Sequence, residues 1–363
     1  MRSVLRGLKN LLLFSVLVGM LATASTVIPR GWEAANILLF KDTLQLTRFR
    51  LAELSPDDYA RHIEQALSEQ DIELARSLLT LADEQGVVLA AQWQEQVAAQ
   101  ETWPATAMRN SSDIWQGIST GRAHSGAGLA AATFSDFTLF GDVRDVIQQS
   151  IAWPEHDPIL LALAGTGLGL SAMTLASGGT AAPVKVGLSL VKVARKSGRL
   201  SKNLARQLTG ITKSAIDPNV VSEVGTRFSK LELNTLNRVQ LDELASAAKR
   251  IVSPTASKQL LKSGRGVRRI AKNTSSKGAL DALQHADSIQ ELSRLARLSD
   301  GLKGSFRASL RLLPDVGKNL YKLTSTLISL LLWLGGAVIW LGTAAWYSLR
   351  ILVWLIMGLW RLF

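Results

Sequence analysis

The sequence predicts an all-α integral membrane protein, with helical extramembrane domains and a C-terminal transmembrane helical hairpin. Apolar residues make up 47% of the 363-residue chain and charged residues only 19%, a balance typical of chains with long buried or lipid-facing segments. Long uncharged runs lie at both ends of the chain. Few strand-like runs occur between them, which disfavours an α/β enzyme core.

The first 29 residues predict either a signal anchor or a cleaved signal peptide. The basic residues before the apolar run are Arg2, Arg6 and Lys9. Leu11–Ile28 is just long enough for an anchor, whereas Ala22-Thr23-Ala24 fits a cleavage site. Under either interpretation the basic cluster keeps the N-terminus inside and sends the next segment to the far side of the membrane.

Residues 30–157 form an acidic segment, with 9 Lys and Arg against 19 Asp and Glu. Ser55 and Asp58 have the spacing of a capping box, and Pro56 suits a first helical position. Apolar spacing then predicts two amphipathic helices, Pro56–Glu69 and Ile72–Gln85. We expect this segment to be a helical domain outside the cytoplasm.

The stretch from Ala66 to Ala75 resembles part of one tetratricopeptide-type helical hairpin. The resemblance covers about 30 residues around it, lacks the Trp and Gly positions of that family and does not repeat. It implies a helix pair at 56–85 that serves as a scaffold or, as the sharper hypothesis, as a surface for a protein partner.

Small residues dominate residues 114–132, where Gly117 and Gly121 have the spacing of a membrane helix-packing motif. Arg122 and His124 within this stretch favour a helix packed against protein over a re-entrant segment. Further on, Asp142, Arg144 and Asp145 form either a functional polar cluster or the first turns of a helix, and the helix start explains them more simply.

Residues 158–184 carry no charge before Lys185 and are rich in Gly and Ala, including Gly165, Gly167 and Gly169. The length suffices for a transmembrane helix and the glycines favour close helix packing, although a buried core helix would look the same. A basic flank follows at once. The flank, typical of the inner side of a membrane, favours a crossing.

Residues 185–322 form a basic helical domain, with 27 Lys and Arg against 10 Asp and Glu, and we expect it in the cytoplasm. Breaks between its helices are predicted at Asp217-Pro218-Asn219, Ser253-Pro254 and Ser263-Gly264. Its densest basic patch consists of Lys258, Lys262, Arg265, Arg268, Arg269 and Lys272. Anionic lipid headgroups attract such a patch. Nucleic acid is disfavoured because Phe228 and Phe306 supply the only aromatic rings between Val184 and Leu320.

Residues 323–363 contain one charge-free run of 27 residues and a second of ten, separated by Arg350. A hairpin with a turn near Gly342-Thr343 would place both runs in the bilayer. One spanning helix followed by an interfacial helix is the alternative. Five of the ten tryptophans lie here, and indole rings prefer the membrane interface.

These segments predict a multi-pass protein of a bacterial-type inner (plasma) membrane that acts as a scaffold or interaction protein between an acidic outer and a basic inner domain. No dinucleotide-binding, P-loop or metalloprotease motif occurs, and the chain has no cysteine, so we expect neither enzymatic activity nor a cofactor. Membrane lipids are the expected partners, and self-association is a hypothesis. The alternative is a membrane-active or pore-forming protein that uses the Gly-rich segment and the hairpin.

Overall fold

A computed structural model describes residues 2–40, 42–100, 139–176, 182–228, 238–313, 315–316 and 324–359. These residues form helices and their connections, and they contain no β-strand beyond an isolated bridge between Ile216 and Val252. The prediction of an all-α fold is confirmed for them. The chain divides into two compact units. Unit 1 comprises Met1–Glu53 and Lys318–Phe363, and unit 2 comprises Leu54–Gly317.

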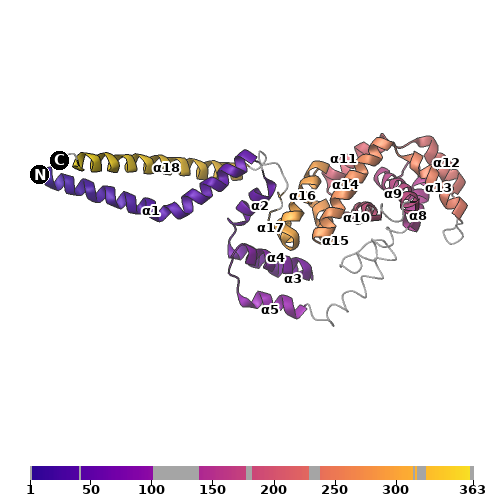
Figure 1. Cartoon of the computed structure of the whole chain (residues 1–363). Coiled ribbons are helices and arrows are strands. Elements are labelled where there is room, and N and C mark those ends of the chain that lie inside the picture. The colour runs from indigo at the N-terminus through magenta and orange to yellow at the C-terminus, as the bar shows by residue number, and fades with distance from the viewer. Residues whose placement is uncertain are drawn as a thin grey trace. The chain divides into compact units, whose positions relative to one another are not determined.

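Unit 1 contains three helices and unit 2 the others, as labelled in Figure 1. The helices of unit 1 are α1 (Arg2–Phe40), α2 (Thr43–Leu51) and α18 (Thr324–Leu359). Those of unit 2 begin with α3 (Pro56–Ser68), α4 (Ile72–Glu84), α5 (Ala91–Gln100), α8 (Leu139–Ile151), α9 (Pro158–Ala176), α10 (Ala182–Lys196) and α11 (Lys202–Lys213). They continue with α12 (Pro218–Phe228), α13 (Arg238–Ile251), α14 (Pro254–Asn273), α15 (Ser276–His285), α16 (Ile289–Leu302), the 3-10 helix η1 (Lys303–Ser305) and α17 (Phe306–Leu312).

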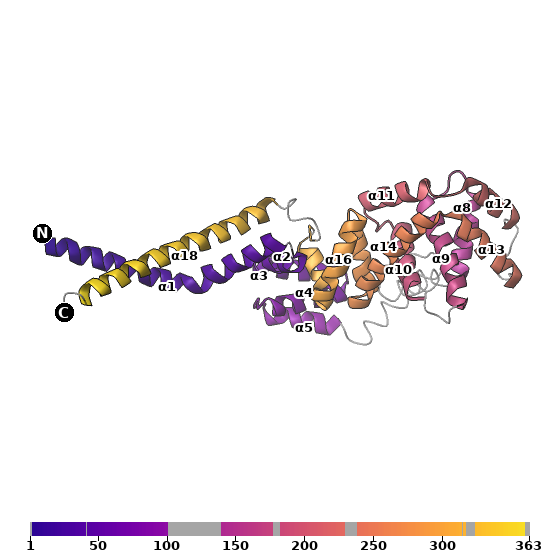
Figure 2. The ribbon, with the colours of Figure 1, turned by 45° about the horizontal axis from the view of Figure 1, so that its top comes forward.

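In unit 1 the two ends of the chain pair as antiparallel helices. Figure 1 and Figure 2 show α1 and α18 side by side, with both termini at the same end of the pair. Their backbones come closest at Gly31, where a Cβ atom would collide with the side chain of Ala337. A small apolar core at one end of the pair is completed by α2. Its buried residues are Ala34, Ile37, Leu46, Phe49 and Leu330.

The turn expected at Gly342-Thr343 does not form, because residues 324–359 are one continuous helix. No proline interrupts this run, and a single glycine inside a helix costs only about 1 kcal/mol. The packing partner expected from the second half of a C-terminal hairpin is supplied instead by α1. The hairpin is therefore made by the two ends of the chain. Within α18, Ser325–Arg350 is long and apolar enough to cross a membrane.

The Gly-rich segment lies at the centre of unit 2, which differs from the crossing that we expected for residues 158–184. Helix α9 packs against α8, α10, α11, α13 and α14, and every residue from Leu161 to Leu170 is buried. A helix that is apolar all round must be enclosed by lipid or by protein. Here the helices of unit 2 enclose it.

The expected boundary between an acidic outer domain and a basic inner domain also differs from the structure. Residues 54–157 and 185–313 contribute to one compact unit, with α8 from the acidic segment packed on α9 and the basic α10 packed on α9 as well. Helix α9 therefore packs between helices of both segments within one unit and does not divide them into two domains.

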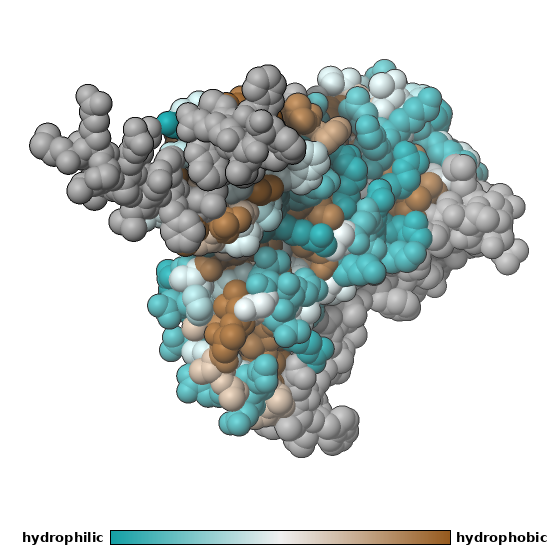
Figure 3. Space-filling view, turned by 60° about the vertical axis from the view of Figure 1, so that its left-hand side comes forward, coloured by the Kyte–Doolittle hydropathy of each residue, from teal (hydrophilic) through white to brown (hydrophobic). Residues whose placement is uncertain are grey.

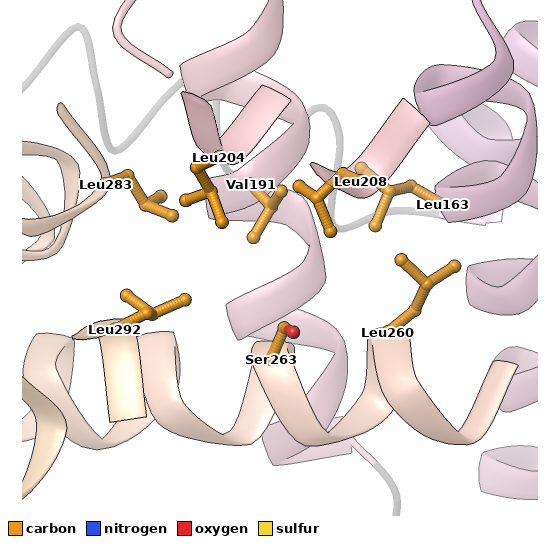
Figure 4. A pocket seen from close by; sticks show the side chains of 8 residues that line it. All are labelled: Leu163, Val191, Leu204, Leu208, Leu260, Ser263, Leu283 and Leu292. Atoms are coloured by element: carbon orange, nitrogen blue, oxygen red, sulfur yellow. The ribbon is translucent and has the colours of Figure 1, made fainter. Parts of the chain in front are cut away.

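Leucine-rich helices fill the interior of unit 2. Figure 4 shows eight side chains from α9, α10, α11, α14, α15 and α16 that point toward one another around an enclosed void of about 10 Å³. These residues are Leu163, Val191, Leu204, Leu208, Leu260, Ser263, Leu283 and Leu292. The hydroxyl of Ser263 donates to the backbone oxygen of Gln259 at 3.1 Å. The void is so small that this region is packed core rather than a ligand site.

Local signals set several helix ends as the sequence predicts. The capping box of Ser55 and Asp58 is present, with Pro56 at the first helical position. Ser253 caps α14, so the predicted break before Pro254 is confirmed. The break expected at Ser263-Gly264 is wrong, because Gly264 lies within α14. There its backbone oxygen lies where a Cβ atom of Gly187 in α10 would be, so Gly187 has no room for a side chain.

A buried arginine of α17 joins the start of α4 to α15. The guanidinium of Arg307, with its side chain only 4% exposed, donates to both carboxylate oxygens of Asp71 at 3.0 and 2.6 Å and to Asp281 at 2.7 Å. The hydroxyl of Ser77 donates to the oxygen of Gly304 and accepts from the nitrogen of Ala308. Together these bonds fix the α3–α4 hairpin to α15 and α17.

The Arg307 contact makes unit 2 sensitive to acid. Burial raises the pKa of Asp71, but the hydrogen bonds and charge of Arg307 outweigh it and lower the pKa from 3.8 to about 2. The unfolded chain therefore takes up its proton first as the pH falls. The stability that this carboxylate contributes is complete above pH 3.8 and is lost as the pH falls toward about 2. We expect this loss to be about 2 kcal/mol.

Urea denaturation of wild type and Asp71→Asn as a function of pH measures this contribution. The Asn variant should be less stable at pH 7 and should lose less stability than wild type between pH 4 and pH 2. Asp83→Asn, an exposed position at the end of α4, is the matched control and should follow wild type. Parallel pH profiles for Asp71→Asn and wild type would contradict the assignment.

Candidate functional site

The predicted basic patch forms one face of α14. Lys258, Lys262, Arg265, Arg269 and Lys272 are all exposed, and we call these five residues the basic face. Their spacing alternates between four and three residues, which keeps all of them on one side of a helix with 3.6 residues per turn. Arg268, half-buried, borders this face.

Most of the basic face is free of acidic neighbours. Arg269 pairs with Asp300 of α16 at 2.6 Å. Within the described parts of the chain, no carboxylate lies within ion-pair distance of Lys258, Lys262, Arg265 or Lys272. Four cations on one helical face therefore point to solvent, where an anionic surface can reach them.

On the face of the molecule shown in Figure 3, hydrophilic residues cover much of the coloured surface, and hydrophobic residues form separate patches between them. Buried polar groups are instead concentrated where α8 meets α10.

A buried ionic cluster joins α8 to α10. The ammonium group of Lys192, whose side chain is 1% exposed, lies 2.9 Å from Asp142 and 2.7 Å from Asp145. Lys185 pairs with Asp142 at 3.0 Å and Lys196 with Asp145 at 3.0 Å. Both carboxylates are at most 5% exposed, so each is held by two ammonium groups away from water.

The two carboxylates differ in their electrostatics. Burial raises the pKa of Asp142 and outweighs the attraction of Lys192 and Lys185. Burial also raises the pKa of Asp145, but there the charges of Lys192 and Lys196 prevail and lower it overall. Such clusters are costly to bury and require complete pairing, which fits a structural role in fixing the register of α8 against α10.

The glycines of α9 allow other groups to approach this helix closely. A Cβ atom at Gly167 would lie 2.7 Å from an oxygen of Asp142, so the missing side chain makes room for the carboxylate of the ionic cluster. A Cβ atom at Gly165 would meet the backbone oxygen of Ala248 at 3.2 Å. One at Gly169 would meet Cγ of Lys249 at the same distance. Gly117 and Gly121 lie outside the described residues.

Sequence reasoning missed the role of the lysines that follow α9. The basic flank that follows residues 158–184 includes Lys185, Lys192 and Lys196. In the structure these three lysines are the cations of the buried cluster. Their spacing of seven and four residues was the available signal, because it puts all three on one helical face. Asp142 does lie in the first turn of α8, as predicted.

The α3–α4 hairpin, proposed from sequence as a surface for a protein partner, is already engaged inside unit 2. Its second helix contacts α17 and η1, and Ser77 bonds to both. Arg311 adds an ion pair with Glu69 at 3.0 Å. The side of the hairpin that faces α17 is therefore closed to an external partner.

Metal binding finds no support in the part of the chain that the structure describes, where no group of three or more His, Asp and Glu residues is placed to hold an ion. Comparison of the chain with protein-family models, with curated proteins and with solved structures finds no match. The function proposed below therefore rests on the geometry of this chain alone.

The ionic cluster predicts a large effect of removing its central cation. Lys192→Met leaves Asp142 and Asp145 with fewer partners in a buried site, and breaking such a pair costs about 3–5 kcal/mol. Urea denaturation of the full chain should show this loss. Arg250→Met, which breaks an exposed pair with Glu223, is the control and should cost less than about 1 kcal/mol. Equal stability of the two variants would contradict the structural role of the cluster.

Proposed function

We propose that the protein is a membrane-anchored interaction protein without enzymatic activity. In this proposal α1 and α18 cross the bilayer as an antiparallel pair, and unit 2 is a water-exposed domain held at one membrane face. The observation that carries the proposal is the pairing of the two apolar ends of the chain. Membrane lipids are the proposed partners of the anchor and of the basic face.

The surface of α18 supports its placement in lipid. Ser325–Arg350 has a mean hydropathy of 2.0, and only 11% of its most apolar stretch is buried within the protein. Large side chains such as Leu332 and Ile339 are 70% and 71% exposed. In water, an apolar surface of this extent along a whole helix would promote association. Lipid chains cover such a surface without cost.

Contacts between α1 and α18 resemble those by which helices associate in membranes. Helices in lipid gain little from hydrophobicity and associate through close packing and interhelical hydrogen bonds. The close approach of Gly31 to Ala337 is of the first kind. The indole nitrogen of Trp340 donates to the hydroxyl of Thr23 at 3.3 Å, which is of the second kind.

These contacts favour α1 as a retained anchor over a cleaved signal peptide. Trp340 of α18 contacts Thr23, which lies within Ala22-Thr23-Ala24, the candidate cleavage site. Cleavage after Ala24 would remove this contact. The uncharged run from Asn10 to Pro29 lies within the continuous helix α1. Two crossings then place both termini inside, next to Arg2, Arg6 and Lys9. All of unit 2 lies on the other side of a bacterial-type plasma membrane.

The basic face of α14 supports contact with anionic lipids. A cation near an anionic membrane surface contributes about 1 kcal/mol, so four cations without acidic neighbours suffice to bias the orientation of a domain that is already tethered. The anchor removes most of the entropic cost of reaching the surface, because it keeps the domain at high effective concentration.

Cysteine accessibility tests the two-crossing topology, because the chain has no cysteine of its own. Ser68→Cys on α3 and Ser214→Cys after α11 are both exposed positions of unit 2. We expect both to react with a membrane-impermeant maleimide on intact cells, and a cysteine added after Phe363 to react only after permeabilisation. Reaction of Ser68→Cys alone would mean that α9 crosses the membrane. Extraction of the protein by alkaline carbonate would refute the anchor.

A fluorophore on Gln259→Cys, exposed on α14, tests the lipid contact of the basic face. In full-length protein reconstituted in nanodiscs, nitroxide headgroup lipids should quench it more strongly when phosphatidylglycerol is present. The effect should fade as the ionic strength rises from about 0.15 M to 1 M, since the Debye length falls from about 8 to 3 Å.

Charge reversal separates this face from the general basic charge of the protein. Lys262→Glu with Arg265→Glu should abolish the dependence on phosphatidylglycerol. Lys202→Glu with Arg206→Glu, two exposed cations of α11, is the matched control and should retain it. Quenching that does not depend on phosphatidylglycerol in any variant, wild type included, would exclude the basic face as a lipid contact.

A further inference from the structure

A cavity of about 170 Å³ lies between α9, α13 and α14 in unit 2. Its walls are mostly aliphatic or without side chains. The residues that line it are Gly165, Thr166, Gly169, Leu170, Ala248, Lys249, Val252, Ser257 and Leu261. Two of its wall residues are glycines, so the cavity exists partly because α9 lacks side chains on this face.

The polar group that distinguishes this cavity from a packing defect is the ammonium of Lys249. This residue is exposed, and its aliphatic stem lies over Gly169, with Cγ 3.2 Å and Cε 3.9 Å from where a Cβ atom of that glycine would be. The stem thus forms part of the wall while the charge remains at the rim. Two other wall residues, Ser257 and Leu261, are the chain neighbours of Lys258 and Lys262 of the basic face.

The geometry points to a binding site for a medium-chain carboxylate, with the alkyl chain in the cavity and the carboxylate on Lys249. A cavity of about 150 Å³ lined by aliphatic groups accommodates benzene, so this one fits about six to eight carbons of a single chain. The positive rim selects an anionic head over a neutral one. The site lies wholly in unit 2 and does not depend on the membrane anchor.

Octanoate is the probe that fits this description, and a diazirine-bearing octanoate allows its position to be mapped. We expect photolabelling of the purified full chain to mark peptides of α9, α13 and α14. Unlabelled octanoate should compete, and uncharged methyl octanoate should compete at least about tenfold less well. Labelling confined to other helices, or equal competition by the methyl ester, would overturn the assignment.

Variants locate the site independently of the label. Ser257→Leu fills the cavity and should weaken octanoate binding by more than about tenfold. Ser293→Leu, a partly buried serine of α16 away from the cavity, should leave it unchanged. Lys249→Gln keeps the stem but removes the charge, and it should erase the preference for octanoate over the methyl ester even if Ser257→Leu does not fold. Full binding by folded Ser257→Leu, or an unchanged preference in Lys249→Gln, would refute the proposal.

Discussion

The ion pairs of Arg307 set the geometry on which the rest of the molecule depends. They join Asp71, near the start of unit 2, to Asp281 and to α17 near its end. As a result α3 and α17, the first and last helices of the unit, are in contact. The chain therefore leaves unit 2 close to where it enters it. This closure is what allows α1 and α18, which are separated by almost the entire sequence, to be partners in unit 1.

Ion pairing between residues far apart in the sequence also explains the uneven distribution of charge along the chain. An acidic segment followed by a basic one suggested two compartments, but the structure pairs the two segments within one unit. Ion pairs join residues of the acidic segment to residues of the basic segment at several places, among them Asp142–Lys192, Asp157–Arg195, Asp71–Arg307 and Glu69–Arg311. An acidic segment followed by a basic one can therefore indicate either two compartments or two segments that pair within one fold. Only the ion-pair partners seen in the structure distinguish these two possibilities.

Local features of the fold could be predicted, and features that depend on a distant partner could not. The capping box at Ser55 and the helix breaks before Pro218 and Pro254 depend on a few neighbouring residues, so the sequence contains the whole signal. The alternating spacing of the basic face is equally local. By contrast, α9 is apolar all round, and neither its length nor its composition distinguishes a core helix from a transmembrane one. The packing partner of α18 likewise is α1, which lies at the other end of the chain.

Four cations of the basic face have no acidic partner among the described residues, although other cations of the basic segment pair with the acidic segment. Like charges three or four residues apart destabilise a helix by a few tenths of a kcal/mol per pair, and Lys258, Lys262 and Arg265 have exactly this spacing. A chain that pairs its buried lysines so completely nevertheless leaves these cations without acidic neighbours among the described residues. Their mutual repulsion is a cost that an anion relieves. In the proposed function an anionic ligand, and not the fold, therefore completes the electrostatics of this face and of the cavity whose wall residues adjoin it along α14.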